Sequence, residues 1–300
     1  MLSSFRILIL SCVVCLLPVV QLQAQKASCT NWNIWLLNPA NSNNPRETAS
    51  GVNDNRTVVG AADYPVNKPN FWGFVHYLNG KVTYWHPANA KYSAFGTRNN
   101  WGNTVGGYVD TLGIPHAAYL HGSTTTLIVH PKAAHHSTGL VAINNLNTLL
   151  GVYRDSNGNS HIFKRRSNAT FLAVPNFPGA KQTSPNGFND NGVVVGTYLN
   201  PGDCCGTSHG YIYRNGTFAT LNYRGVKNTN TEMIGIDNHG VIVGNHYGNG
   251  FLYKNGGFKD IVGPHGEPVV ARGISANNSI VTGDMWINSS GSHGFTVTCQ

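Results

Sequence analysis

Four histidines recur at similar places along the chain and could together bind a metal ion. They are His116, His161, His209 and His293, and each begins or lies in an apolar stretch such as "HGYIYR" or "HGFTVT". Imidazole nitrogen is a common zinc ligand, and nitrogens that bind one zinc at about 2.1 Å lie about 3 to 4 Å apart. Whether these side chains can meet depends on the elements that carry them.

Those elements repeat. The motif "NDNGVVVG" at residues 189–196 recurs as "NDNRTVVG", "NNLNTLLG", "DNHGVIVG" and "ANNSIVTG". A stretch resembling "HGFTVT" follows each copy in the same phase. Six units with one period predict a repeat architecture. The glycines that mark the units, 39 to 48 residues apart, are Gly60, Gly106, Gly151, Gly196, Gly244 and Gly283.

Each unit reads as four short strands. In residues 183–223 they are a strand around Asn186 to Asn189, then "GVVVGTY", "HGYIYR" and "TFATLNY", separated by Gly and Asn turns. Nothing shows the 3.6-residue periodicity of a helix. Many strands are apolar on both faces, as expected for a sheet between two neighbours. The chain is therefore predicted to be all-β, a six-bladed β-propeller of four-stranded blades, with a twelve-stranded pair of stacked sheets as the main alternative.

The two ends of the chain predict how the ring closes. The sixth unit ends at "HGFTVTCQ" without a fourth strand, and the missing piece stands at residues 33–39 as "NIWLLNP". We expect this N-terminal strand to pair into the C-terminal blade, which removes the unpaired sheet edges. A disulfide between Cys29 and Cys299 would hold it there. Cys204 and Cys205 could bridge each other, pair with another chain or remain thiols.

Residues 1–24 read as a secretory signal peptide, because Arg6 precedes the apolar run "ILILSCVVCLLPVV". That run is shorter than the roughly 20 residues of a spanning helix, so we expect no stable membrane insertion after its removal. Residues 25–300 then form a single secreted propeller domain, which we expect to be a monomer. Without Arg6 the formal charge falls from +8 to +7, and this positive charge favours acidic partners. Because the basic residues are scattered along the chain, the sequence does not favour nucleic acid as the partner.

The predicted fold argues against metal binding by the repeated histidines. On the third strand of each blade they lie at least two strand spacings, about 10 Å, from the axis, so they cannot share one ion. We expect each ring nitrogen to hold a backbone group in its own or the next blade. Asn and Asp of the opening motif fit tight turns better than calcium sites. His130, His135 and His136 have no Cys or carboxylate nearby, so neither a metal nor a cofactor is predicted.

The pattern resembles the extracellular repeat family called HAF, whose units carry Gly-Ile-Asn, Val-Val-Gly and His-Ala-Phe or His-Gly-Phe. The matching pieces include residues 51–53, 58–60, 194–196, 209–211, 235–237 and 293–295. Trp72 and Asn249 replace the histidine, and Arg98 stands where the Asn belongs. The resemblance covers about residues 30–298 and implies a secreted bacterial protein. It implies no reaction and no catalytic residue.

No catalytic motif stands out. The chain has no His-Glu-x-x-His and no phosphate-binding loop, so no catalytic residue is assigned. The alternative is a secreted hydrolase or lyase acting on polysaccharide, with two carboxyl groups within about 10 Å of each other. Its candidate residues are Glu47, Asp63, Asp110, Asp155 and Glu232.

The long, varied loops should gather on one face. In a four-stranded meander the second turn and the link between blades share one end, and here these are the longer connections. We predict a non-enzymatic binding or surface-interaction module whose ligand, an anionic polysaccharide or a cell-surface protein, binds at this face through aromatic and basic side chains. The predicted ligand-binding residues are Trp72, Lys91, Tyr92, Tyr223, Arg224 and Trp286.

Overall fold

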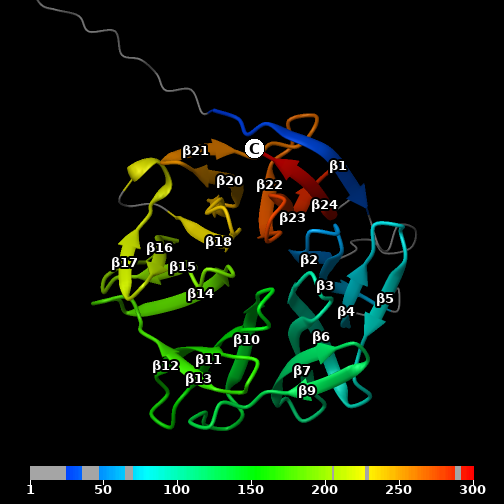
Figure 1. Cartoon of the computed structure of the whole chain (residues 1–300), viewed down its shortest axis with the longest axis vertical. Coiled ribbons are helices and arrows are strands. Elements are labelled where there is room, and N and C mark those ends of the chain that lie inside the picture. Colours follow the sequence, from blue (N-terminus) through cyan, green and yellow to red (C-terminus); the bar gives the residue numbers. More distant parts are fainter. Residues whose placement is uncertain (1–24, 36–46, 65–69, 205, 227–229, 288–291) are drawn as a thin grey trace, which may run out of the picture.

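Short apolar strands that alternate with Gly and Asn turns arrange themselves as six antiparallel sheets around one axis (Figure 1). The computed structural model describes residues 25–35, 47–64, 70–204, 206–226, 230–287 and 292–300. Each sheet has four strands, and consecutive sheets follow one another around the ring. The six-bladed β-propeller is confirmed, and the alternative of two stacked sheets is wrong.

In each blade the strands follow chain order from the axis outward, except that the outer strand of blade 6 is the N-terminal β1. Blade 1 comprises β2 (Glu47–Val52), β3 (Val58–Asp63), β4 (Phe71–His76) and β5 (Val82–Trp85). Blade 2 comprises β6 (Ala90–Arg98), β7 (Thr104–Asp110), β8 (Pro115–His121) and β9 (Thr124–Leu127). Blade 3 comprises β10 (Thr138–Ile143), β11 (Leu149–Arg154), β12 (Ser160–Arg165) and β13 (Phe171–Val174). Blade 4 comprises β14 (Gln182–Phe188), β15 (Val194–Leu199), β16 (His209–Arg214) and β17 (Thr217–Thr220), followed by a 3-10 turn, η1 (Tyr223–Gly225). Blade 5 comprises β18 (Glu232–Ile236), β19 (Ile242–His246), β20 (Asn249–Lys254) and β21 (Gly257–Asp260). Blade 6 comprises β22 (Val269–Ile274), β23 (Ile280–Trp286), β24 (Ser292–Cys299) and β1 (Cys29–Trp35).

The N-terminal strand closes the ring as predicted. Strand β1 pairs antiparallel with β24, and in Figure 1 the two lie side by side, blue against red. Cys29 pairs directly with Cys299, and their sulfurs form a disulfide, which confirms that prediction. The strand begins at Cys29 rather than Asn33, with an irregularity in between, and residues 36–39 of the predicted strand lie outside the described residues. The closed ring leaves no blade without a neighbour.

The N-terminal segment also reaches blade 5. Lys26 forms a parallel bridge with Asp260, the last residue of β21. The backbone N–H of Ala27 donates to the Asp260 carbonyl, and the Asp260 N–H donates to the carbonyl of Gln25. The segment therefore links the outer edges of two blades, which the sequence did not indicate.

The glycine that ends each "VVG" stretch is required by close contact inside the blade. A Cβ on Gly196 would lie 2.1 Å from the carbonyl oxygen of Ser184 on the inner strand and 2.8 Å from the Tyr211 ring. The same crowding recurs at the other five glycines, each time with an inner-strand carbonyl within 2.6 Å. The repeated glycine thus lets the second strand pass beneath an aromatic ring of the third strand in four blades, as at Tyr211.

Each inner strand carries a β-bulge, which turns one residue out of the regular alternation. One shift in register on each inner strand flanks a residue of this kind, and β6 has a second shift at Lys91. The six residues are Ser50, Gly96, Val141, Asn186, Ile234 and Arg272. All six residues line one axial channel of about 310 Å³. The bulge is therefore the local feature that gives the channel its side chains.

The repeated turn of the opening motif is an Asx turn that also binds the next blade. The Asn53 Oδ1 accepts hydrogen bonds from the backbone N–H groups of Asn55 and Thr57. Its Nδ2 donates to the Asn99 carbonyl of blade 2 at 3.1 Å. The same two-sided arrangement recurs at Asn99, Asn144 and Asn189. Turn chemistry is confirmed for this motif, and its second role is to fix the blades to one another.

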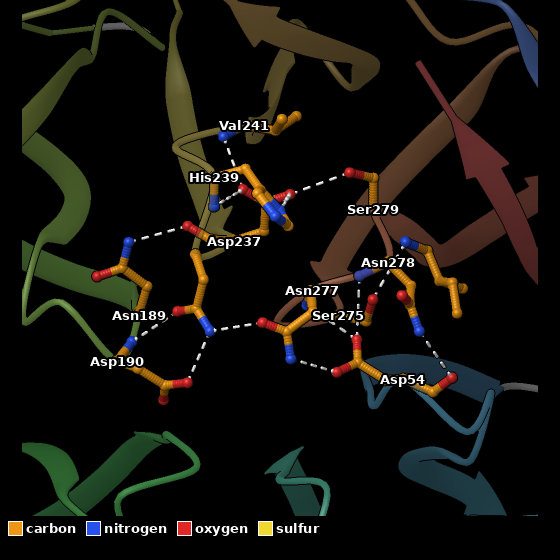
Figure 2. A network of polar contacts seen from close by, with 12 residues as sticks. Asp54, Asn189, Asp190, Asp237, His239, Val241, Ser275, Asn277, Asn278 and Ser279 are labelled. Carbon is orange, nitrogen blue, oxygen red and sulfur yellow. Dashed lines mark hydrogen bonds and ion pairs between the residues drawn. The ribbon is translucent and has the colours of Figure 1, made fainter.

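A second set of hydrogen bonds runs through the residue after each turn residue and closes on itself. Asn100 bonds Asn145, and Asn145 bonds Asp190. Asp190 bonds Asn238, and Asn238 bonds Asn277. Figure 2 shows the last part, in which Asn277 donates to the Asp54 carboxylate. Asp54 bonds Asn100 and completes the circle. The blades are thus joined around one end of the channel by side-chain oxygens that accept from backbone and side-chain N–H groups of the neighbouring blade.

At Asp237 the Asx turn lacks the bond that the Asn side chain donates to the next blade elsewhere. Asp237 occupies the place of Asn189 but lacks an amide N–H, so it cannot donate to the next blade. Its carboxylate accepts from the Ser279 hydroxyl at 3.0 Å and from the backbone N–H groups of His239 and Val241 (Figure 2). Burial raises the pKa of Asp237, and these hydrogen bonds oppose the rise.

Gly151→Ala should destabilise the protein because the new Cβ would lie 2.6 Å from the Gly139 carbonyl and 2.4 Å from the Phe163 ring. Overpacking of this kind costs about 1 to 3 kcal/mol. Gly139→Ala is the matched control, since its nearest contact would be an ordinary 3.5 Å to Val152. Equal unfolding free energies of the two variants in urea titrations would contradict this account of the repeated glycine.

Asp237→Asn should change how stability depends on pH. Because the pKa is raised in the folded state above 3.8, the folded protein binds a proton that the unfolded chain releases, and stability falls as pH rises through this range. Asn has no such proton, so the melting temperature of the variant relative to wild type should increase from about pH 3.8 upward. A difference that stays constant between pH 3 and pH 7 would refute the assignment.

Candidate functional site

The longer connections lie at the end of the ring opposite the Asx turns. We call this end the loop face; among the described residues it carries the second turns of blades 2, 3 and 5 and the links 86–89, 128–137, 175–181, 221–226 and 261–268. The Asx turns and the turns before the outer strands lie at the other end, the turn face. This separation follows from the meander order of the strands and agrees with the expectation from sequence.

Three neighbouring blades repeat a set of Tyr, His and Asp at the loop face. In blade 3, Tyr153 pairs across the strands with His161, and their rings stack at 4.9 Å between centroids. The His161 Nε2 lies 2.8 Å from the Asp155 carboxylate. Blade 2 has the same set in Tyr108, His116 and Asp110, and blade 4 has it in Tyr198, His209 and Asp203.

The partner expected for these histidines was wrong. The sequence predicted that each ring nitrogen would hold a backbone group, whereas Nε2 contacts a carboxylate in all three sets. The carboxylate is itself fixed, since the Asp155 Oδ1 accepts from the backbone N–H groups of Asn157 and Asn159. The bond from His161, with these further hydrogen bonds, lowers the pKa of Asp155 to about 2, although burial opposes the shift.

Beside the His161 ring, blade 3 has a pocket of about 420 Å³. We call it the blade 3 pocket, and its size falls within the range of small-ligand sites. Phe163 and Phe171 line it, and so do His130, Pro131 and Lys132 of the link 128–137 between blades 2 and 3. The residues that line it are His130, Pro131, Lys132, Tyr153, His161, Ile162, Phe163, Phe171, Ala173, Val174, Pro175 and Asn176.

His130 connects the link to the pocket wall. Its ring stacks on Tyr153 at 3.8 Å and meets the edge of Phe171 at 4.7 Å. Burial lowers the pKa of His130, and the charges of Lys132 and His161 lower it further. The Lys132 backbone N–H donates to Nδ1 at 3.2 Å, so the neutral ring carries its proton on Nε2.

The pocket therefore combines apolar walls with a few polar groups. The exposed Lys132 supplies a positive charge, and His130 Nε2 supplies a hydrogen-bond donor. His161, whose side chain is 41% exposed, has Nδ1 available because Nε2 is taken by Asp155. Such a site can hold a ring with one apolar face and polar edges, including an acidic group.

The residues predicted to bind ligand do not form one site. Trp72 in β4 stacks on His86 at 4.3 Å, and its indole N–H has no acceptor among the described residues. Lys91 and Tyr92 are exposed in β6, and Tyr92 lines a separate groove of about 380 Å³ between blades 2 and 3. Trp286 is 55% exposed at the end of β23 in blade 6. These residues are spread over three blades.

Tyr223 and Arg224 are the predicted residues that lie together. Both sit in η1, on the link between blades 4 and 5. The Tyr223 hydroxyl donates to the Asp260 carboxylate, and Arg224 lies 3.4 Å from the same carboxylate. Tyr223 also stacks on His246 at 4.3 Å. These contacts tie the link to blade 5, and a role in ligand binding stays a prediction.

The carboxyl groups of the alternative enzyme are spread over four blades. Glu47 and Asp63 share one end of blade 1, because Glu47 pairs with Ala62. The buried Glu47 carboxylate accepts from the Gly294 backbone N–H of blade 6 at 2.6 Å. The other three lie in separate blades, Asp110 in blade 2, Asp155 in blade 3 and Glu232 in blade 5. The hydrolase or lyase stays an alternative prediction.

The sequence analysis missed the blade 3 pocket, although one signal was present. Asp110 and His116, Asp155 and His161, and Asp203 and His209 are each six residues apart. Such constant spacing across a second turn indicates a carboxylate facing a histidine on the next strand. The sequence has no comparable signal that residues of the link 128–137 line one pocket together with residues of β12 and β13.

Within the described ranges, no group of three or more His, Cys, Asp or Glu side chains could hold a metal ion. No helix among these residues is long and apolar enough to cross a membrane. The predicted signal peptide, residues 1–24, and Cys205 lie outside the described residues, so secretion and the pairing of Cys204 stay predictions. The disulfide that closes the ring is typical of proteins in an oxidising compartment.

Comparison with known proteins shows the fold alone. No protein-family model matches the chain, and no curated protein matches its sequence, so the resemblance to the HAF family stays a prediction. Among solved structures it is similar to XC5397, a gluconolactonase from Xanthomonas campestris, with a TM-score of 0.54 and 10% identity over 93% of this chain and 98% of that chain. It is also similar to the Trypanosoma rangeli sialidase in complex with sialic acid, with a TM-score of 0.51 and 11% identity over 92% of this chain and 60% of that chain.

Asp155→Asn should alter stability at low pH. A carboxyl group with its pKa lowered from 3.8 to about 2 contributes stability above pH 3.8 that is lost as pH falls through about 2. The variant has no such group, so its deficit in melting temperature at pH 5 should shrink between pH 3.8 and pH 2. A deficit that does not change with pH would show that the bond to His161 has no electrostatic role.

Proposed function

We propose that this protein is a secreted, non-enzymatic carbohydrate-binding propeller that retains acidic polysaccharide at its loop face through the blade 3 pocket. The observation that carries the proposal is the composition of that pocket, in which Phe171 and Ala173 form the wall and Lys132 lies at the margin. The apolar face of a sugar ring packs on aromatic side chains, and its acidic group pairs with a lysine.

The repetition of the Tyr–His–Asp set supports binding over reaction. A reacting pair of groups is needed once in a protein, whereas Asp155 and His161 have counterparts in blades 2 and 4. The set therefore belongs to the repeat. In blade 3 it presents Nδ1 of His161 at the loop face in a fixed orientation, and fixed polar groups favour specific binding.

Net charge supports an acidic ligand. The chain carries a formal charge of +8, of which Arg6 belongs to the predicted signal peptide. A positive surface attracts polyanions and increases their rate of association. The apparent affinity should therefore fall as salt concentration rises.

The test is retention of polygalacturonate, with neutral dextran as the control polymer, in affinity electrophoresis and calorimetry. Ala173→Glu places a carboxylate at an exposed position in the pocket and should weaken binding at least tenfold. Ala173→Gln, which adds similar volume without charge, should weaken binding less. Lys132→Gln should cost about threefold to fivefold, consistent with about 1 kcal/mol for an exposed ion pair.

Lys81→Gln is the matched control, since Lys81 is exposed on the turn face. Its affinity should equal that of wild type. Unchanged binding by Ala173→Glu would exclude the blade 3 pocket as the site. Release of new reducing or unsaturated ends from the polymer would instead support the enzyme alternative.

A further inference from the structure

The axial channel offers a second site that is independent of the blade 3 pocket. Its six bulge residues come one from each blade, and five of them are uncharged. Arg272 is therefore the single charged residue at this level of the channel. A volume of about 310 Å³ suits a small molecule rather than a polymer.

The carboxylate of Asp284 fixes the position of the Arg272 side chain. Its Nε donates to the Asp284 Oδ2 at 2.9 Å, and the Asp284 Oδ1 accepts from the Ala49 backbone N–H of blade 1 at 3.1 Å. The Asp284 side chain is 8% exposed and that of Arg272 is 43% exposed. The carboxylate thus fixes the guanidinium in the channel wall at the junction of blades 6 and 1.

The outer edge of the guanidinium has no partner. Among the described residues, the single contact of Arg272 is through Nε, so Nη1 and Nη2 have neither a hydrogen-bond acceptor nor a carboxylate. Two parallel N–H groups at one edge of a guanidinium match the two oxygens of a carboxylate. The channel wall therefore presents a preformed anion-binding group.

Other bulge residues supply polar and apolar contacts. Asn186 uses its Nδ2 on the Met233 carbonyl and the Thr197 hydroxyl, which leaves Oδ1 as an acceptor. Val141 and Ile234 come from the blades on either side of Asn186 and are apolar. Ser50, beside Arg272 in ring order, adds a hydroxyl group. Hydroxyl groups on a ligand can bond Asn186 and Ser50.

Two further charged residues lie on the inner strands close to this level. Arg98 lines the channel, but its guanidinium lies against its own blade, where Nη1 donates to the Thr104 hydroxyl at 2.8 Å, Nη2 lies beside Gly102, and Nε is buried without a partner among the described residues. Glu232 lies on β18, two residues before the bulge residue of blade 5, and forms no ion pair with Arg272 in the described structure. Asp190 also lines the channel and is bonded to Asn145 and Asn238 of the neighbouring blades. Arg272 is thus the cation whose guanidinium edge is exposed in the channel wall.

We infer that the channel binds a small hydroxylated monocarboxylate, with its carboxylate on Arg272 and its hydroxyl groups on Asn186 and Ser50. Such a molecule is either free or the terminal residue of an acidic oligosaccharide. The inference does not depend on the proposed function, because the two sites share no residue.

The test uses a double variant in which both new residues already occur at the equivalent positions of other blades. In blade 5 the residue equivalent to Asp284 is Asn245, which bonds both the N–H and the carbonyl of Ala271 in blade 6. Asn is also the natural bulge residue of blade 4. Arg272→Asn combined with Asp284→Asn therefore removes the cation, leaves no buried unpaired charge, and should melt within a few degrees of wild type.

The probes are D-galacturonate, its trimer and neutral D-galactose, measured by calorimetry on the full secreted chain. Wild type should bind galacturonate at least tenfold more tightly than galactose, and the double variant should lose this preference. Tighter binding of the trimer than of the monomer would identify a chain end as the ligand, and the reverse would identify a free acid; either result supports the inference.

Galacturonate binding of equal strength in wild type and a folded double variant would overturn the inference, as would equal affinity for galactose. Ala173→Glu separates the two proposals, because it should weaken retention of polygalacturonate and leave binding of the monomer unchanged. Loss of monomer binding in that variant would place the acid in the blade 3 pocket and likewise overturn the channel site.

Discussion

The hydrogen bonds of the Asx turns are the interaction on which the ring depends. One short side chain, such as Asn99, satisfies the backbone of its own turn through Oδ1 and the carbonyl of the next turn through Nδ2. The turn and the contact between blades therefore form together, from the same residue. Because a buried backbone group without a partner is costly, the angle between neighbouring blades is fixed wherever this residue recurs.

Near the point where the ring closes, the contacts between blades differ from the repeated Asn contact. Where Asp237 replaces the amide, the Ser279 hydroxyl donates to the carboxylate and keeps blades 5 and 6 joined. At the junction of blades 6 and 1, Asp284 and Glu47 each accept a backbone N–H from the other blade. The disulfide and the pairing of β1 with β24 join the two ends of the chain within blade 6. The blade that contains both ends is thus bonded internally and to blade 1.

The two faces of the molecule differ in how closely their residues repeat from blade to blade. On the turn face the same residue types repeat, because every blade must make the same contact with the next. On the loop face the links differ in length and sequence, and their side chains determine what each blade exposes. His130 from the link 128–137 covers Tyr153 and closes one side of a pocket, whereas Phe177 from the next link stacks on Tyr198. The differences between blades, which a binding site requires, therefore arise from the links.

The sequence by itself determined the repeat, the number of blades, the closing strand and the pairing of Cys29 with Cys299. These features rest on local spacing, since each unit carries its own turn residues and strand pattern, and the one missing strand has one candidate. Only the tertiary structure decided that Asp155 faces His161, that Arg272 enters the channel at a bulge, and that Trp72 and Trp286 lie in different blades. The physical reason is that strand periodicity fixes which residues share a face within a blade. Contacts across blades depend instead on the course of the links and on the exact register, which periodicity does not encode.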